Sequence, residues 1–183
     1  TAHHGLNSQL VCEQLPPSPR DAIALAEKQI AAAATPVTVV GSSLGGYYAT
    51  HLAEKHRLRA ALINPAVVAH ISLAGFIGPQ TNLYTGETFE FHPEYIEELR
   101  SIEVPRISRP QDFLLLTETG DEVLDYRLAV AKYAGARPSI LLVIQAASRS
   151  SCSGVVRVAR SMPCRHCRKP SSSSRRCSCS ARV

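Results

Sequence analysis

The stretch Thr35-Pro-Val-Thr-Val-Val-Gly-Ser-Ser-Leu-Gly-Gly-Tyr-Tyr-Ala-Thr50 decides the fold of this chain. Its β-branched run, residues 37–40, is typical of a short buried strand. The pentapeptide Gly41-Ser-Ser-Leu-Gly45 follows at once, and apolar residues at helical spacing come after it. A G-x-S-x-G pentapeptide between a strand and a helix is the context of a nucleophile elbow, a sharp turn that exposes a reactive serine.

The glycines of this pentapeptide have a mechanical explanation. Side chains at Gly41 or Gly45 are expected to collide where the strand and the helix approach each other. The turn exposes the hydroxyl of Ser43, and the backbone N–H of Leu44 lies at the start of the helix, where it can stabilise an oxyanion. Two alternatives remain: a Gly/Ser-rich turn without chemistry, and a phosphate-binding loop, which the absence of a following Gly-Lys-Ser/Thr disfavours.

Helical and extended segments alternate along the chain around this motif. We expect helices over residues 20–34 and 126–134, and further buried strands over residues 60–64, 112–117 and 139–144. Residues 70–92 are rich in glycine and loop residues, which indicates a lid or substrate-side insertion. The alternation predicts an α/β fold with a parallel sheet.

Asp121 follows the strand expected over residues 112–117, in a glycine-containing turn that opens a helix. The acid of a Ser-Asp-His triad occupies this place, and Ser before Asp before His is the order of the α/β hydrolases. Glu122 and Asp125 are the next candidates, and a helix N-cap is the alternative role for Asp121. The base histidine is expected after residues 139–144, but His166 alone follows Asp121 in the sequence and is a weak candidate.

The composition divides the chain into two unlike parts. Residues 1–125 contain all 15 acidic residues and 8 of the 20 Lys/Arg, whereas residues 126–183 contain 12 Lys/Arg. Residues 148–183 comprise 11 Ser, 9 Lys/Arg and 5 Cys, a composition that cannot bury enough apolar area to fold. We therefore predict a hydrolase-like domain over residues 1–147 and a disordered basic tail over residues 148–183.

The tail allows a third class of function, the binding of zinc or nucleic acid. Cys164-Arg-His-Cys167 and Cys177-Ser-Cys179 offer thiolate ligands, but the second pair lacks the C-x₂-C spacing of a zinc knuckle. The arginines have no aromatic neighbours on which bases could stack, so nucleic-acid binding is not expected. No metal and no organic cofactor is expected in the domain.

Several motifs in the same order resemble the small bacterial esterases of the YqiA/YcfP type, a branch of the α/β-hydrolase superfamily. The resemblance is carried by His4-Gly-Leu-Asn-Ser8, Gln14-Leu-Pro-Pro17, Gly41-Ser-Ser-Leu-Gly-Gly-Tyr-Tyr-Ala-Thr50, Asn64-Pro-Ala66, Tyr84-Thr-Gly86 and Thr119-Gly-Asp-Glu-Val-Leu-Asp-Tyr-Arg127. It implies a parallel sheet with helices on both faces, here incomplete. It also implies Ser43 as nucleophile, Asp121 as acid, the Leu6 and Leu44 amides as oxyanion hole, and Asn64 and Tyr84 on the substrate side.

The chain departs from that family at two places. The family has a strand before its His-Gly pair and further sheet elements after it, whereas residues 9–13 alone separate the pair from the Gln-Leu-Pro-Pro segment here. The family also has a histidine-containing loop after its last strand, where this chain has its Ser/Arg/Cys-rich end. We interpret that end as out of frame or misassembled, beginning between Arg137 and Ser148.

These observations predict a cytoplasmic serine esterase that hydrolyses short-chain carboxylic esters or thioesters. The partner expected is a small ester, and no membrane segment is expected because no apolar run is long enough to span a bilayer. The alternative is a hydrolase homologue that lacks its base histidine and has no activity.

Overall fold

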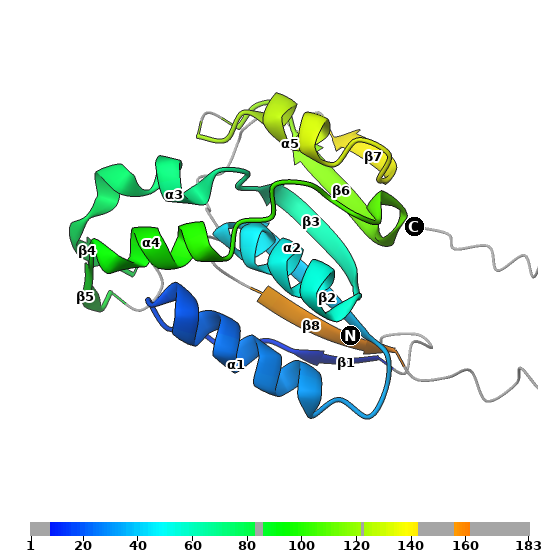
Figure 1. Ribbon diagram of the computed structural model, residues 1–183, viewed down its shortest axis with the longest axis horizontal. Helices are drawn as coiled ribbons and strands as arrows, with labels where there is room; N and C mark the ends of the chain where they lie inside the picture. The colour runs from blue at the N-terminus through cyan, green and yellow to red at the C-terminus, as the bar shows by residue number, and fades with distance from the viewer. Residues whose placement is uncertain (1–7, 83–85, 122, 143–155, 162–183) are drawn as a thin grey trace, which may run out of the picture.

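The structure is a computed structural model that describes residues 8–82, 86–121, 123–142 and 156–161. Its centre is a sheet of six strands in the order β1-β8-β2-β3-β6-β7, drawn in Figure 1. Four neighbouring strands are paired in parallel: β2 (Val37–Ser43), β3 (Arg59–Pro65), β6 (Phe113–Glu118) and β7 (Arg137–Leu142). The predicted α/β class and its parallel strands are therefore confirmed.

Two further strands extend this sheet beyond β2, of which β8 is antiparallel to both of its neighbours, so that β1 runs in the same direction as β2. β8 (Val156–Ser161) pairs with β2 on one side and with β1 (Ser8–Val11) on the other. The backbone of residues 156–161 thus lies in the sheet, although this segment belongs to the part of the chain expected to be disordered. Three of residues 155–158 are valine, which is compatible with a strand, and the pairing of β8 covers an edge of β2 that would otherwise expose unpaired backbone groups.

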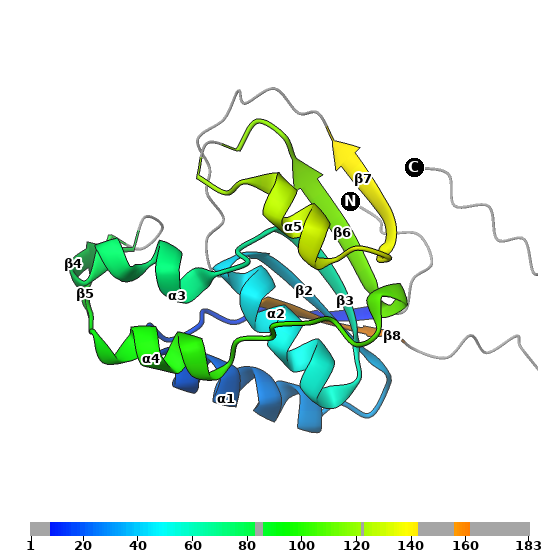
Figure 2. The same cartoon turned by 45° about the horizontal axis from the view of Figure 1, so that its top comes forward.

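The described helices pack on one face of the sheet, where helices on both faces were expected. α1 (Pro19–Ala31), α2 (Leu44–His56) and α5 (Tyr126–Lys132) lie on the same side of the strands in Figures 1 and 2. The physical reason is the strand order, because the chain passes from β2 to β3 to β6 to β7 in one direction across the sheet. Right-handed crossovers in a single direction place every connecting helix on the same face.

The burial of alternate strand residues agrees with this arrangement. One core cluster joins the helix-side residues of the strands, such as Val39, Leu62 and Leu115, to Ala49 of α2 and Ala129 of α5. The neighbouring residues that point to the other face are less buried, and Ile63 is 42% exposed. The helix-covered face therefore supplies most of the buried apolar surface of the described sheet.

Local signals explain the boundaries of the helices. Ser18 is the N-cap of α1 and accepts a hydrogen bond from the backbone N–H of Asp21 at 3.2 Å, and Pro19 stands at the first helical position. A capping serine followed by proline is a typical start of a helix. At the carboxyl end of α2, Arg57 adopts a left-handed conformation that ends the helix.

The segment between β3 and β6 contains more regular structure than expected. It comprises α3 (Ala69–Ser72), the 3₁₀ turn η1 (Ala74–Phe76), the hairpin of β4 (Gly78–Thr81) and β5 (Thr88–Phe91), α4 (Glu94–Ser101) and the 3₁₀ turn η2 (Pro110–Asp112). Within the described residues, no helix is long and apolar enough to cross a membrane.

Candidate active site

Ser43 stands at a tight junction between strand and helix. β2 ends at Ser43 and α2 begins at Leu44, with no residue between them. Ser43 has φ 52° and ψ −122°, a backbone conformation that L-residues rarely adopt, and its side chain makes no capping hydrogen bond to α2. This strained turn between strand and helix is compatible with the predicted nucleophile elbow, whose chemistry remains a prediction.

Two glycines allow the elbow to close. A Cβ added at Gly41 would overlap the backbone carbonyl of Gly45 and lie 2.7 Å from the nitrogen of Gly46. The predicted need for glycine at position 41 is confirmed. Gly46 is a second such position, which the sequence did not reveal: a Cβ there would lie 2.7 Å from the Cβ of Pro65, at the end of the adjacent strand. Both glycines are required by close approach rather than by a positive φ.

The loop that follows β3 is attached directly to the elbow. The backbone N–H of Ala66 donates a hydrogen bond to the carbonyl oxygen of Ser43 at 3.0 Å, and Ser43 is in register with Pro65. The neighbouring Asn64 has φ 40°, another left-handed conformation. The carboxyl ends of β2 and β3 therefore meet at one edge of the sheet, where parallel sheets place their ligand sites.

Asp121 lies in the turn after β6, at the same edge. Its Oδ1 accepts hydrogen bonds from the backbone N–H groups of Val123 and Leu124, both at 2.9 Å, and its Oδ2 accepts one from the Nδ2 of Asn64 at 3.0 Å. Asp125, not Asp121, is the N-cap of α5. The role of helix cap suggested as an alternative for Asp121 is therefore filled by Asp125.

Asn64 was expected on the substrate side. In the structure, both polar groups of its side-chain amide form hydrogen bonds within the chain. Its Oδ1 accepts a hydrogen bond from the backbone N–H of Glu118 at 2.7 Å, and its Nδ2 donates to Asp121. The residues in this network are separated by more than fifty positions in the sequence, so no local pattern could have identified the contact.

The first turns of α2 are anchored by buried polar side chains. The hydroxyl of Tyr47 donates to the carbonyl oxygen of Leu99 at 3.0 Å, which ties α2 to α4. Thr50 Oγ1 lies 2.6 Å from the hydroxyl of Tyr133, and burial raises the pKa of Tyr133 to about 12. These neutral hydrogen bonds hold the helix that begins at the elbow.

Lys132 contacts the loop after β3. Its Nζ donates to the carbonyl oxygen of Val67 at 3.3 Å and lies 6.0 Å from the centre of the Tyr47 ring. Burial lowers the pKa of the Lys132 amine, and Glu103 opposes that shift. This lysine was not among the predicted site residues, since its spacing along α5 gives no sign of the contact.

The four histidines of the described ranges contact residues other than Ser43 and Asp121. These pairs are His51 with the carbonyl oxygen of Ile102, His56 with Glu27, His70 with Glu103, and His92 with the ring of Tyr95. In this part of the chain, no histidine forms a hydrogen bond with Ser43 or Asp121. The described residues therefore show no assembled Ser-His-Asp triad.

Several predicted site residues lie outside the described residues. They are Leu6, the second oxyanion donor; Tyr84, on the substrate side; Glu122, an alternative acid; and His166, the weak candidate for the base. Across the described ranges, no group of three or more His, Cys, Asp or Glu side chains converges as a metal site would require.

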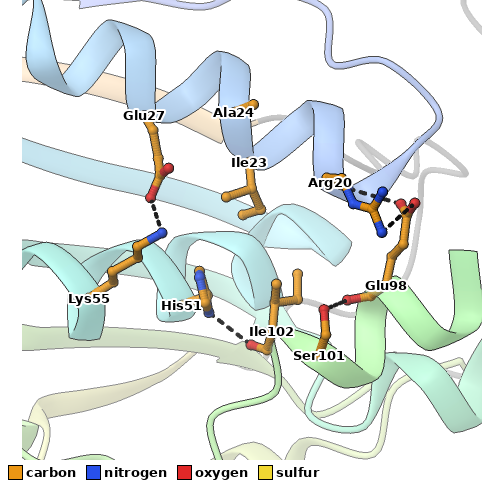
Figure 3. Close-up of a pocket in the computed structure, with 9 residues that line it drawn as sticks. All are labelled: Arg20, Ile23, Ala24, Glu27, His51, Lys55, Glu98, Ser101 and Ile102. Carbon is orange, nitrogen blue, oxygen red and sulfur yellow. Dashed lines mark hydrogen bonds and ion pairs between the residues drawn. The ribbon is translucent and has the colours of Figure 1, made fainter.

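A cavity of about 340 Å³ lies between α1, α2 and α4, and Ser43 is not among the residues that line it (Figure 3). Its charged side chains are already paired: Lys55 Nζ is 2.7 Å from Glu27, and Arg20 is 3.7 Å from Glu98. His51 lines the cavity, and its Nδ1 must carry a hydrogen because the carbonyl oxygen of Ile102, 3.0 Å away, only accepts. Because these charged side chains already have partners, the described residues that line the cavity offer no free charged group for the hydrolysis of an ester.

The burial of His51 predicts a pH dependence of stability. Burial lowers the pKa of His51 below its usual 6.5, although the hydrogen bond to Ile102 opposes the shift. The unfolded chain then binds this proton more readily than the folded chain, so the free energy of unfolding falls as the pH drops below about 6.5. His51→Asn, which retains a donor near the Nδ1 position, is expected to reduce the decrease in Tm between about pH 7 and about pH 5.

The matched control for this measurement is His92→Asn, a change at an exposed histidine. Its Tm is expected to follow that of the unmodified chain across the same range. Equal pH dependence of Tm in all three proteins would contradict the assignment to His51.

A family model and two solved structures match parts of the chain. The model of an uncharacterised protein family, UPF0227, matches residues 1–146. Two solved structures are similar to the chain: the "Putative hydrolase" of Agrobacterium vitis S4, with 20% identity and a TM-score of 0.47, and the esterase domain of a Rhodothermus marinus protein, with 22% identity and a TM-score of 0.41. The first match covers 62% of this chain and 53% of the other, and the second covers 64% and 52%. The chain therefore spans about half the length of each of these structures.

Proposed function

Since this chain belongs to UPF0227, the family of YcfP/YqiA-like proteins, we propose that it is a serine hydrolase of short-chain carboxylic esters or thioesters. The observation that carries the proposal is the conformation of Ser43, a non-glycine residue with φ 52° between β2 and α2. Such strain is costly, roughly 1–3 kcal/mol, and it recurs where a fold presents a reactive side chain.

In the proposed mechanism, Ser43 Oγ attacks the ester carbonyl while a histidine accepts its proton. A tetrahedral intermediate forms, and its oxyanion accepts a hydrogen bond from the backbone N–H of Leu44. The intermediate collapses to an acyl-serine as the histidine returns the proton to the leaving alcohol or thiol. In the second half of the reaction, the histidine accepts a proton from water as the water attacks the acyl-serine. The carboxylic acid then leaves, and the histidine returns the proton to Ser43 Oγ. Asp121 orients the imidazole throughout.

The second oxyanion donor and the base are assigned to segments outside the described residues. Leu6 is the donor that the family resemblance implies. Three histidines outside the described residues are available as the base, namely His3, His4 and His166. The proposal requires one of them to reach Ser43.

The alternative is a hydrolase homologue without activity, and the described histidines favour it. None of the four forms a hydrogen bond with Ser43 or Asp121 among the described residues. Without a base, the Ser43 hydroxyl is an unactivated alcohol, and loss of one triad member can cost roughly 10⁶-fold in kcat.

Covalent labelling distinguishes these two functions. The purified chain is incubated with a fluorophosphonate, which phosphonylates activated serines, and the modified peptide is identified by mass spectrometry. We expect the adduct on Ser43 and not on Ser42. A chain that is denatured before the fluorophosphonate is added is expected to acquire no adduct. A native chain that acquires no adduct would instead support the inactive homologue.

Replacement of the three candidate histidines one at a time then identifies the base. Alanine at the base is expected to abolish labelling of Ser43, while alanine at each of the other two leaves the rate of labelling unchanged. Unchanged labelling in all three variants would contradict the proposed triad.

A further inference from the structure

Asn64 joins the end of β3 to the turn that carries Asp121. Its Oδ1 accepts from the backbone N–H of Glu118, and its Nδ2 donates to Asp121 Oδ2. This orientation of the amide is unambiguous, because a backbone N–H can only donate and an ionised carboxylate can only accept. Asn64 also adopts φ 40°, which asparagine tolerates better than most residues.

The hydrogen bonds of Asp121 divide unequally between its two oxygens. Oδ1 accepts two backbone N–H groups, from Val123 and Leu124, which uses both of its lone pairs. Oδ2 accepts a single hydrogen bond, from Asn64, among the contacts of the described residues. One acceptor position of Oδ2 is therefore left for a further donor, and Asn64 determines its direction.

We propose that Asn64 is a positioning residue that aims the free lone pair of Asp121 Oδ2 at the imidazole N–H of the catalytic histidine. This inference rests on the proposed function, in which Asp121 orients the base. Two rigid anchors hold the carboxylate, namely the N–H groups of its own turn and the amide at the end of the strand next to the elbow. A displacement of about 1 Å at such a group can cost about 100-fold in rate.

The simpler role for Asn64 is a structural one, in which its bond to the N–H of Glu118 only secures the loop. Two substitutions separate the roles, and both accept a positive φ. Asn64→Asp keeps an acceptor for Glu118 but replaces the donor to Asp121 by a carboxylate. Asn64→Gly removes both bonds and adds no charge.

The positioning role predicts a specific kinetic pattern for Asn64→Asp. At about pH 8 its kcat for a short p-nitrophenyl ester is expected to fall about 10- to 100-fold with little change in KM, because two facing carboxylates repel each other. At lower pH one of the pair takes up a proton and can donate across the contact. The ratio of variant kcat to wild-type kcat is therefore expected to rise as the pH falls to about 5.5.

A structural role predicts the opposite pattern. Asn64→Asp would keep the wild-type kcat with a ratio that is independent of pH, and Asn64→Gly alone would lose activity. Gln111→Glu serves as the matched control, because it also adds one negative charge, at an exposed residue before the amino end of β6. Its kcat is expected to remain at the wild-type value.

A double-mutant cycle tests the contact without reference to activity. Asn64→Asp and Asp121→Asn are each expected to lower Tm at about pH 8. Together they exchange donor and acceptor, so that the new amide donates to the new carboxylate and every other bond of the pair is preserved. The double variant is expected to recover Tm while remaining inactive.

These measurements distinguish a failure of the positioning role of Asn64 from a failure of the proposed hydrolase function. Recovery of Tm in the double variant together with the pH-dependent loss of kcat in Asn64→Asp supports it. Absence of coupling in Tm overturns the contact, and coupling with a normal kcat in Asn64→Asp overturns the positioning role. Wild-type activity equal to that of Ser43→Ala defeats the proposed function itself, and the positioning role with it, while the Tm cycle still reports on the contact.

Discussion

Ser43→Ala is expected to reduce kcat/KM for hydrolysis of p-nitrophenyl acetate by about 10⁴-fold or more. The variant removes the nucleophile, so that no acyl-serine can form, while the backbone of the elbow and the N–H of Leu44 stay in place. The residual rate should equal that of water attack assisted by the remaining site. Release of p-nitrophenol, followed with the purified chain and with the variant at equal concentration, measures the effect.

The matched control is Ser42→Ala, one residue earlier in the same strand. Ser42 lies in β2 and has the same partial burial as Ser43, so its replacement makes a chemically identical change beside the elbow. It is expected to retain the wild-type rate. If the unmodified chain shows no turnover above Ser43→Ala, although circular dichroism shows both to be folded, the inactive homologue is the correct description.

Gly41→Ala is expected to destabilise the protein by about 3 kcal/mol or more, or to prevent its accumulation as a folded chain. The added methyl group would overlap the carbonyl of Gly45 and press on the nitrogen of Gly46, and both groups belong to the backbone of the elbow. Backbone atoms cannot move away by a rotamer change, as the end of a flexible side chain can. The strand and the helix would therefore have to separate. Urea denaturation, followed by circular dichroism, measures the free energy of unfolding.

Gly75→Ala is the control for this substitution. A Cβ at Gly75 would have no atom within 4 Å, and the residue lies in the short turn η1. Its free energy of unfolding is expected to change by less than about 0.5 kcal/mol. Equal urea midpoints for Gly41→Ala and Gly75→Ala would contradict the tight closure of the elbow.

Residues close together in the sequence account for the part of the site that could be predicted. The strand at residues 37–40, the glycine at 41 and the helix after Gly45 all constrain one turn, so the position of Ser43 could be inferred from a single stretch. Asp121 was predicted in the same way, from a strand followed by a glycine-containing turn. Local backbone conformation depends on neighbouring residues, and these are visible in the sequence.

Contacts between distant segments could not be predicted from these patterns. The pairing of Asn64 with Asp121, the approach of Gly46 to Pro65 and the addition of β8 to the sheet each depend on which strands become neighbours. The helices were expected on both faces, but the strand order places the described ones on a single face. An alternating pattern shows that a strand has a buried side without showing what covers each side.

The sequence by itself determined the α/β class, the turn between strand and helix at Ser43 and the turn that carries Asp121, because each depends on backbone conformation encoded within a few residues. The tertiary structure alone decided that Asn64 holds Asp121 and that the described helices share one face. Those features follow from strand order and the handedness of crossovers, which bring together residues more than fifty positions apart.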